Sequence, residues 1–318
     1  MKLAPIVLFV YNRPKHTEQT LEALGANELA KDSILYVFCD GPKIDATSET
    51  LQKIATVRKI VEERKWCKEV ILIQRETNLG LASSIVAGVS QIVNEYGKVI
   101  VLEDDILTSR YFLYFMNANL DLYAADKRVY AIGACNFYGI KNRRNSFFLQ
   151  IPDTWGWATW KDRWEKFEPS ARKLQERLEN NVQAKYIFNC YNSFDYSGML
   201  NNQIEGKIDS WGIRWQAAVA LNNGLVLYPS PSLTNHLKSA NNEATHQLEE
   251  VSPKLMNRIP KITRIALEVK KSSKKQVIIT LSGTKSGIGI YAREIKQLAG
   301  GVFNFLKQHG FIKSKKVV

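Results

Sequence analysis

The stretch Val99-Ile-Val-Leu-Glu-Asp-Asp105 decides the fold, because a short, continuous apolar run ends there in three carboxylates. Apolar runs of this length are typical of strands that are buried on both faces of a sheet. Three similar runs precede it at intervals of roughly 30 residues, which is the length of a βαβ unit. These runs are Ile6–Val10, Ile34–Phe38 and Val70–Ile73.

Segments of helical composition lie between the apolar runs: Thr17–Leu24, Ser48–Lys65 and Leu81–Tyr96. Strands that alternate with helices predict an α/β fold, with a mixed, mainly parallel sheet flanked by helices. In such sheets, ligands bind beyond the carboxyl ends of the strands. The residues after each strand are therefore the first candidates for a binding site.

Each predicted strand ends in polar, charged or turn-forming residues. They are Tyr11-Asn12-Arg13-Pro14, Asp40-Gly41-Pro42, Arg75 with Asn78-Leu79-Gly80, and Glu103-Asp104-Asp105. Neither a GxGxxG nor a GxxxxGK[ST] motif occurs at these positions. Their absence argues against a dinucleotide-binding or P-loop protein.

The acidic triplet is the sharpest chemical signal. Three adjacent carboxylates at the end of a buried strand repel one another, so keeping them ionised requires a cation or strong hydrogen bonds. Mg²⁺ or Mn²⁺ fits, because both prefer oxygen ligands and also bind the oxygens of a diphosphate. The alternative is a solvated loop that caps a helix near Ser109.

The net charge of +13 is confined to one end of the chain. Residues 1–250 contain 29 basic and 29 acidic residues, whereas residues 251–318 contain 15 basic and two acidic ones. We therefore expect a globular domain over residues 1–250 and a basic tail over 251–318. Within the domain, the βαβ rhythm predicts a first half at about 1–135, and a second half of mixed pattern follows at about 136–250.

The composition also predicts the cellular compartment and the state of the cysteines. The chain of 318 residues has no apolar run of the roughly 20 residues that a membrane span needs, and Ile6–Val10 is too short for a secretory signal. We therefore expect a cytoplasmic protein. The four cysteines (Cys39, Cys67, Cys135 and Cys190) lack metal-ligand spacing, which favours buried free thiols.

A family resemblance rests on several segments in a fixed order. They are Pro5-Ile-Val-Leu-Phe-Val-Tyr-Asn-Arg-Pro14, Asp40-Gly41, Arg75-Glu-Thr-Asn-Leu-Gly-Leu-Ala82, Val101-Leu-Glu-Asp-Asp-Ile106 and Trp155-Gly-Trp157. Together these segments resemble bacterial glycosyltransferases of the GT-A fold. The acidic triplet is similar to the Glu-Asp-Asp element of the N-acetylglucosaminyltransferase I family. The resemblance covers roughly residues 4–246. It implies a nucleotide-sugar half at about 1–135 and an acceptor half at about 136–250.

The resemblance implies an enzyme that moves a hexosyl or N-acetylhexosaminyl group from a UDP-sugar, with inversion, in the presence of Mn²⁺ or Mg²⁺. Asp105 would be the metal ligand, and Glu103 and Asp104 would face the donor. The remaining donor-site residues implied are Arg13, Asp40, Arg75, Asn78 and Gly80. Ordinary turn chemistry is the alternative for Arg13, Asp40 and Gly80.

The second half of the chain supplies the other candidates. Trp155, Gly156 and Trp157 are expected to contact the acceptor or the donor sugar, since aromatic faces stack on sugar rings; the alternative is core packing. Asp209 resembles the catalytic base of the family, with Asp195 second and Asp153 third. The alternative for Asp209 is an N-cap of a helix over Trp211–Leu221.

Two histidines and the tail complete the expectations. His246, ahead of His236, would join the metal or touch the diphosphate, whereas a structural role is the alternative for both. From Ile288 onward, apolar residues at three- and four-residue spacing with surrounding lysines predict an amphipathic basic helix. Such a helix is typical of binding to an anionic membrane surface at the inner face, and docking on the core is the alternative. Membrane binding would favour a lipid-linked or cell-envelope glycan acceptor.

Two other functions remain to be weighed. A sugar nucleotidyltransferase would carry a Gly-rich, basic loop after the first strand, where this chain has Tyr11-Asn-Arg-Pro14. A basic protein that binds nucleic acid without catalysis would need a basic domain surface or a recognisable motif. The domain is neutral and lacks such a motif, so no nucleic-acid partner is expected.

Overall fold

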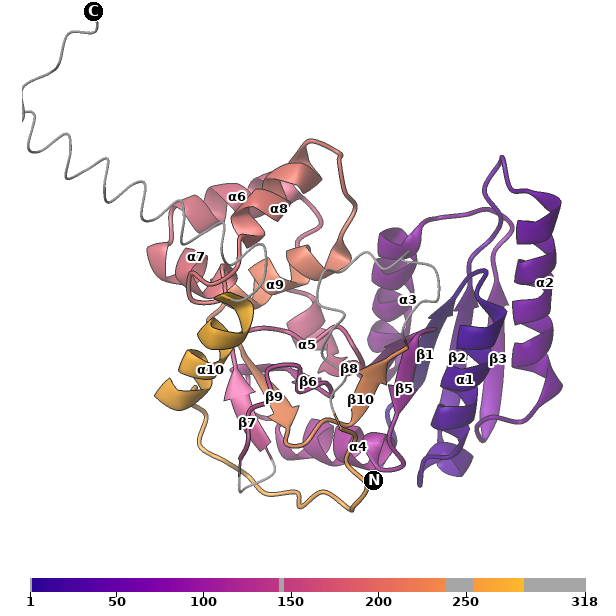
Figure 1. Ribbon diagram of the computed structural model, residues 1–318, viewed down its shortest axis with the longest axis horizontal. Helices are drawn as coiled ribbons and strands as arrows, with labels where there is room; N and C mark the ends of the chain where they lie inside the picture. Colours follow the sequence, from indigo (N-terminus) through magenta and orange to yellow (C-terminus); the bar gives the residue numbers. More distant parts are fainter. Residues whose placement is uncertain (1, 143–145, 238–253, 283–318) are drawn as a thin grey trace, which may run out of the picture.

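An eight-stranded sheet forms the centre of the computed structural model, which describes residues 2–142, 146–237 and 254–282. The strands lie in the order β3-β2-β1-β4-β8-β6-β9-β7 (Figure 1). Their bounds are β1 (Ile6–Val10), β2 (Ile34–Cys39), β3 (Glu69–Gln74), β4 (Lys98–Glu103), β6 (Val129–Gly133), β7 (Ser146–Leu149), β8 (Trp157–Trp160) and β9 (Leu225–Pro229). The pairs β2–β3, β1–β2, β1–β4 and β6–β9 are parallel, and β8 and β7 run antiparallel to their neighbours. The predicted α/β class with a mixed, mainly parallel sheet is confirmed.

The first half follows the βαβ rhythm of the sequence. The helices between its strands are α1 (Pro14–Gly25), η1 (Ala30–Asp32), α2 (Ser48–Glu63) and α3 (Leu81–Tyr96). Local chemistry sets these bounds. The fixed φ of Pro14 suits the first turn of α1. The Thr47 hydroxyl accepts a hydrogen bond from Thr50 N at the start of α2, and Gly97 ends α3 in the left-handed region.

Alternation along each strand divides the core between the two faces of the sheet. In β1, Val7 and Phe9 join a core with α3, whereas Ile6, Leu8 and Val10 join a second core with α1, α2 and α4 (Phe112–Leu122). Both faces of the central strands are therefore covered by helices. This burial explains why the strands read as continuous apolar runs.

Tryptophan packing dominates the second half. Trp157 on β8 stacks on Trp211 at 5.3 Å between ring centroids and also contacts Trp164 and Trp215. The helices of this half are α5 (Lys161–Trp164), α6 (Ala171–Glu179), α7 (Val182–Phe188), α8 (Tyr196–Ile204) and α9 (Trp211–Leu221). Most of them cover the same face of the sheet as α3.

A separate two-stranded sheet joins β5 (Ile106–Thr108) to β10 (Thr234–His236) in antiparallel register. Within it, His236 pairs with Ile106, the residue that follows the acidic triplet. This short sheet therefore returns the chain from β9 to the carboxyl end of β4.

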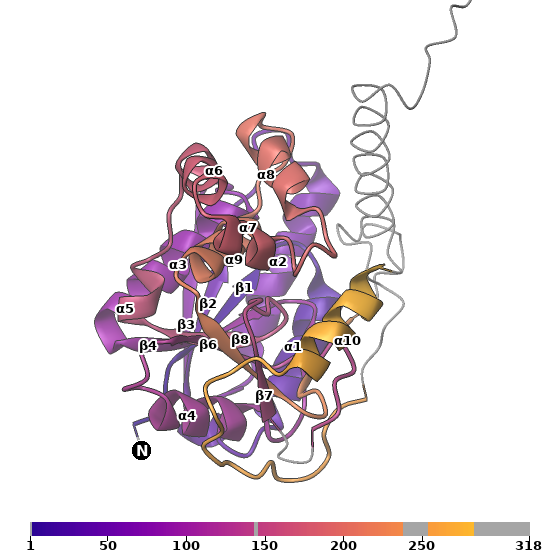
Figure 2. The same cartoon turned by 90° about the vertical axis from the view of Figure 1, so that its left-hand side faces the viewer.

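Residues 254–282 contact several parts of the domain, among them the edge strand β7. Met256 N donates to Ser232 O at 2.7 Å, and Ile265, Ser273 and other residues of this segment line a cavity with Ser146 and Phe147 of β7. The segment ends in α10 (Lys271–Ser282), which lies beside β7 in both ribbon views (Figure 2). The predicted boundary near residue 250 stays a prediction, and the basic helix expected from Ile288 lies outside the described residues.

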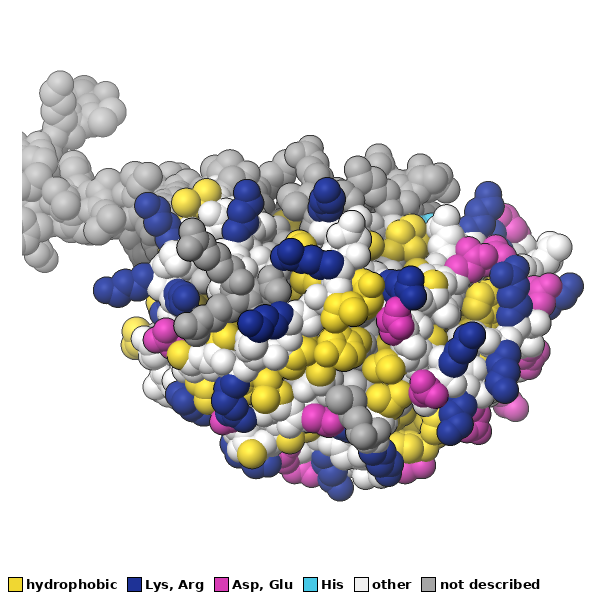
Figure 3. All heavy atoms as spheres, turned by 90° about the horizontal axis from the view of Figure 1, so that it is seen from below, with side chains coloured by type: hydrophobic (Ala, Val, Ile, Leu, Met, Phe, Trp, Pro, Cys, Tyr) yellow, Lys and Arg dark blue, Asp and Glu magenta, His cyan; other side chains and the backbone are white. Residues whose placement is uncertain are grey.

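The surface of the described part carries both signs of charge. On the face seen from below, Lys and Arg side chains are interspersed with Asp and Glu around an apolar area (Figure 3). The four cysteines are free and buried, as their spacing predicted. Among the described residues, the helices are too short or too polar to cross a membrane.

Candidate functional site

Asp104 and Asp105 lie at the carboxyl edge of the parallel half of the sheet. Parallel pairing of β1 with β4 places Phe9 opposite Glu103, so the residues after both strands meet at this edge. The two aspartates are only 3% and 8% exposed. This burial excludes the alternative in which they belong to a solvated loop.

Arg13 binds both aspartates. Its Nη1 donates to Asp105 Oδ2 at 2.9 Å and its Nε to Asp104 Oδ2 at 3.2 Å, while Nη2 donates to Asp104 Oδ1. The Asn-Arg-Pro turn sets this geometry, because Arg13 immediately precedes the first turn of α1. The Arg13 side chain remains 39% exposed. One side of the guanidinium thus stays open to a ligand.

His236 reaches the same carboxylate from the second half of the chain. Its Nε2 lies 3.1 Å from Asp105 Oδ2, and the ring of Trp155 packs on it at 5.2 Å between centroids. Burial lowers the pKa of His236, but the hydrogen bond and the charge of Asp105 outweigh burial and leave that pKa raised. His246 lies outside the described residues, so the prediction for it stays untested.

The three carboxyl groups of the triplet have different electrostatic surroundings. Burial, followed by the charges of Asp105 and Asp104, raises the pKa of Glu103 to about 8. Burial also raises the pKa of Asp104 to about 6, against the opposing charge of Arg13. For Asp105, burial is outweighed by the hydrogen bond from His236 and the charge of Arg13, so its pKa is lowered. Asp105 is therefore the carboxyl group of the triplet that ionises most readily.

The residues present fit a divalent cation only together with a substrate. Asp105 Oδ2 and His236 Nε2 converge, but the described part of the chain holds no group of three or more His, Cys, Asp or Glu residues placed to bind a metal. Mg²⁺ typically binds proteins through one or two carboxylates and takes its other ligands from phosphates and water. Asp105 and His236 would hold a cation of this kind in the presence of a diphosphate.

Asp40, predicted to bind the donor, is instead occupied by the main chain. Its Oδ1 accepts hydrogen bonds from Gly41 N at 3.1 Å and Leu79 N at 3.0 Å, and its Oδ2 accepts from Gly80 N at 3.1 Å. The Asn78 side chain donates to Gly41 O at 3.0 Å. We call this set of contacts the Asp40 clamp, which ties the loop after β2 to the loop after β3. These contacts agree with the alternative in which the Asp40 carboxylate stabilises turns.

Arg75 and Gly80 support the same loops. The Arg75 Nη1 donates to Ser84 Oγ at 2.8 Å, and its guanidinium lies 5.6 Å from the centroid of the Phe38 ring. Gly80 precedes α3 with a φ of +78°, a conformation that glycine adopts without a steric penalty. A donor-binding role for Arg75, Asn78 and Gly80 stays a prediction.

The tryptophan segment divides into two environments. Trp155 is half-buried beside His236, whereas Trp157 is 1% exposed among three other tryptophans. The prediction that Trp157 contacts a sugar is wrong, because its ring faces the core. At Gly156, a Cβ would lie 2.9 Å from Thr234 Cγ2, so the missing side chain makes room for the protein's own core. The sugar contact expected for Gly156 stays a prediction.

The three candidate bases differ in their partners. Asp209 is exposed and pairs with Arg214, whose Nη2 donates to its Oδ1 at 2.8 Å. The N-cap of α9 is Ser210, not Asp209, since the Ser210 hydroxyl accepts from Ile213 N. Asp195 caps α8 through Gly198 N. Asp153 accepts from the N–H groups of Ala134 and other residues, and its role as third candidate stays a prediction.

Two residues of α1 belong to the site although the sequence did not single them out. Thr20 Oγ donates to Asp104 O at 2.8 Å and fixes the main chain of the triplet. His16 interacts electrostatically with Arg13, Asp105 and His236; burial and then the charge of Arg13 lower its pKa. His16 lies three residues after Arg13, and this helical spacing was a usable signal.

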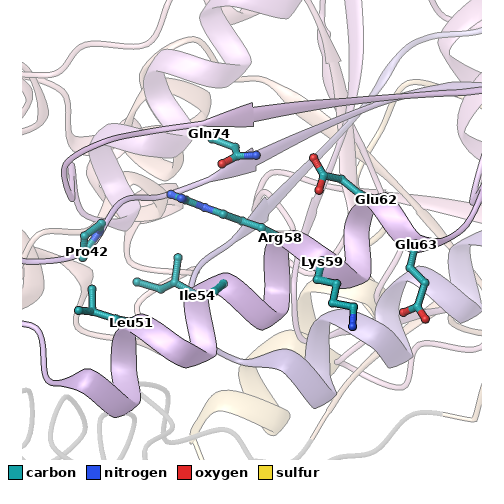
Figure 4. A pocket seen from close by; sticks show the side chains of 9 residues that line it. Pro42, Leu51, Ile54, Arg58, Lys59, Glu62, Glu63 and Gln74 are labelled. Atoms are coloured by element: carbon teal, nitrogen blue, oxygen red, sulfur yellow. The ribbon is translucent and has the colours of Figure 1, made fainter.

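A groove of about 530 Å³ lies elsewhere, between α2 and the edge strand β3. Arg58 extends across it from α2, and Pro42 and Leu51 form one end (Figure 4). Arg58 Nη2 donates to Arg75 O at 3.0 Å, so the groove borders the outer side of the Asp40 clamp. The carboxylates of the triplet do not line it.

Comparisons with known proteins give limited guidance. No protein-family model matches the chain, and no curated protein matches it. Solved structures that align with it include S. aureus TarS (19% identity, TM-score 0.30), over 41% of this chain and 21% of that one. The galactosyltransferase LgtC, in complex with donor and acceptor sugar analogs, aligns at 10% identity and a TM-score of 0.39, over 70% of this chain and 72% of that one.

A third alignment involves the CMP:2-keto-3-deoxy-manno-octonic acid synthetase complexed with CTP, at 14% identity and a TM-score of 0.33. It covers 56% of this chain and 84% of that one. The present chain thus spans about a fifth of the first of these proteins, TarS. At these identities and TM-scores the alignments do not extend to a shared activity, so the geometry around Asp105 carries the functional argument.

Proposed function

We propose that this protein is a metal-dependent glycosyltransferase of the GT-A type, which moves a sugar from a UDP-sugar to a glycan or lipid-linked acceptor. The observation that carries the proposal is the position of the Asp105 carboxylate. It lies at the carboxyl end of β4, between Arg13 of the first half and His236 of the second. A site of this kind at the carboxyl edge of a parallel sheet suits a nucleotide diphosphate.

The charged side chains of the site have complementary roles in donor binding. Bound Mn²⁺ or Mg²⁺ would neutralise the charge that develops on the departing diphosphate. Asp105 and His236 would hold that ion. Arg13, with its guanidinium partly exposed, can pair with phosphate oxygens in a planar, two-pronged geometry.

An inverting transfer also needs a carboxylate that removes the proton of the acceptor hydroxyl. We assign this role to Asp209. Arg214 orients its carboxylate at 2.8 Å, and the exposed position leaves the other oxygen open to an incoming hydroxyl. Proton removal would then strengthen the attack of the acceptor oxygen on the anomeric carbon as the bond to the diphosphate breaks.

Product analysis separates transfer from nucleotide-sugar synthesis. The chain is incubated with a panel of UDP-sugars and Mn²⁺, and in parallel with UTP and sugar 1-phosphates. We expect release of UDP in the first reaction, lost in Asp105→Ala and kept in Asp121→Ala, whose carboxylate pairs with Lys98 on the surface. Release of pyrophosphate in the second reaction, without UDP in the first, would identify a sugar nucleotidyltransferase instead.

The association with a membrane is a separate part of the proposal. The lysines near the C-terminus would bind anionic lipid headgroups by charge, at about 1 kcal/mol each. Co-sedimentation with vesicles that contain phosphatidylglycerol should therefore fall when Lys313, Lys315 and Lys316 are changed to Glu. Equal binding to neutral phosphatidylcholine vesicles would contradict a charge-driven association.

A further inference from the structure

A row of aromatic side chains leads away from Asp105. His236 packs on Trp155 at 5.2 Å, Trp155 meets Phe137 edge to face at 5.9 Å, and Phe137 meets Tyr138 edge to face at 5.6 Å. All four side chains are half-buried. We call Trp155, Phe137 and Tyr138 the aromatic row. Its partial exposure sets it apart from the core around Trp157, which is closed to solvent.

Buried hydrogen bonds fix the aromatic row in place. Asp153 joins its two segments, because Oδ1 accepts from Trp155 N at 2.9 Å and Oδ2 accepts from Ala134 N at 2.7 Å, just after β6. The Asn136 side chain then brackets the turn that carries Phe137 and Tyr138, accepting from Ile140 N and donating to Ile140 O. The row is therefore preorganised by groups that it does not share with Arg13 or Asp105.

The sheet order places the aromatic row on one side of the acidic site. Arg13 and the Asp40 clamp follow β1 and β2, whereas Phe137 follows β6 and Trp155 precedes β8. The strand β4, which Asp105 follows, separates these two groups in the sheet. A nucleotide that occupies the β1–β3 side would leave the row facing the sugar end of the donor.

The start of α9 lies next to the same row. A Cβ at Gly212 would lie 3.4 Å from Thr154 Cγ2, and Thr154 directly precedes Trp155. Asp209, assigned above as the base, lies just before this first turn of α9. The first turn of α9 therefore lies beside Thr154, next to the row.

We propose that the aromatic row is the acceptor subsite and that it takes a pyranose ring of a glycan, an inference that rests on the proposed function. The C–H face of a pyranose matches a half-exposed aromatic face, and its hydroxyls need polar groups at the rim. Here the ring of His236 lies at one end of the row and can supply such a polar group.

Saturation-transfer NMR with simple sugars tests the row in the full chain. The probes are the methyl pyranosides of glucose, galactose, mannose and N-acetylglucosamine, at up to about 50 mM. We expect at least one pyranoside to bind, and Phe137→Ala and Tyr138→Ala each to weaken it about fivefold. Phe137→Leu keeps an apolar side chain of similar size but removes the ring, so it tests the row even if Phe137→Ala fails to fold.

A matched control separates stacking from a general loss of aromatic surface. Tyr114, a half-buried tyrosine on α4, is changed to Ala, and binding should stay unchanged. Failure of all pyranosides to bind the wild type would overturn the proposal. So would equal binding by the wild type, Phe137→Leu and Tyr138→Ala.

Calorimetry with UDP distinguishes failure of this inference from failure of the proposed function. If Phe137→Leu binds UDP as tightly as the wild type but binds the pyranoside more weakly, the result supports an acceptor subsite. A matching fall in UDP affinity would show that the row binds the nucleotide and would overturn the assignment. If pyranosides bind through the row but UDP does not bind the wild type, the proposed function fails while the row stands as a sugar site.

Discussion

Asp40 and Asp105 occupy equivalent places in the fold and have opposite surroundings. Each follows a buried parallel strand at the same edge of the sheet. The carboxylate of Asp40 accepts hydrogen bonds from the main-chain amides of Gly41, Leu79 and Gly80. Asp105 is bound instead by two side chains, the guanidinium of Arg13 and the imidazole of His236.

The difference separates a structural carboxylate from one available for function. Main-chain amides leave Asp40 only if the loops around it unfold. Arginine and histidine side chains can rotate and exchange one anionic partner for another, and Arg13 is already partly exposed. A carboxylate held by side chains is therefore the better candidate for binding a ligand.

The largest effect that we expect is the loss of stability in Asp40→Ala. Three main-chain N–H groups would lose their acceptor, and buried donors without partners cost about 1–3 kcal/mol each. We predict a loss of about 3 kcal/mol in the free energy of unfolding, measured by urea denaturation. Asp105→Ala should cost clearly less, because Arg13 keeps Asp104 as a partner. Equal losses of stability in Asp40→Ala and Asp105→Ala would contradict the distinction between the two aspartates.

Asp209 extends the comparison, because its partner Arg214 is also a side chain. We expect Asp209→Asn to reduce turnover about 100-fold or more, as loss of a general base does. Stability and UDP affinity should stay near wild type. Steady-state kinetics with a fixed UDP-sugar and acceptor measure the change, with Lys207→Gln as a surface control. Near-normal turnover in Asp209→Asn would remove this residue from the mechanism.

Arg13→Ala should lower stability by about 2 kcal/mol in the absence of metal, because two buried carboxylates lose their shared cation. The partial exposure of Arg13 keeps the loss below that of a fully buried pair. Addition of Mn²⁺ should raise the melting temperature of Arg13→Ala more than that of the wild type. An Arg13→Lys variant, which retains the positive charge, should lie between them. Equal shifts in all three proteins would show that Mn²⁺ does not bind these carboxylates.

Much of the fold could be predicted from the sequence, because strands buried on both faces leave continuous apolar runs. β1 matches its predicted bounds, and β2 extends one residue beyond Phe38. The acidic triplet followed from the same reasoning, since ligands gather at the carboxyl ends of parallel strands. The sequence pattern was sufficient to locate an element wherever its buried residues form a continuous run or recur at the helical period.

The partners of the site residues could not be predicted in the same way. The Asp40 clamp forms with amides of a loop that lies 39 positions away in the chain. The contact of His236 with Asp105 depends on the short pairing of β10 with β5, which leaves little periodic signal. Trp155 and Trp157 stand in similar sequence surroundings. Only the structure shows that β8 begins at Trp157 and that the Trp157 ring lies in the core.

Isothermal titration of UDP into the wild type and Asp105→Asn, with and without Mn²⁺, tests the central claim most directly. Asp40→Asn is the matched control, because Asp40 is the aspartate that main-chain amides hold. We predict that Mn²⁺ strengthens UDP binding at least tenfold in the wild type and in Asp40→Asn, and that this gain disappears in Asp105→Asn. UDP affinity that is independent of Mn²⁺ and unchanged in Asp105→Asn would contradict the account.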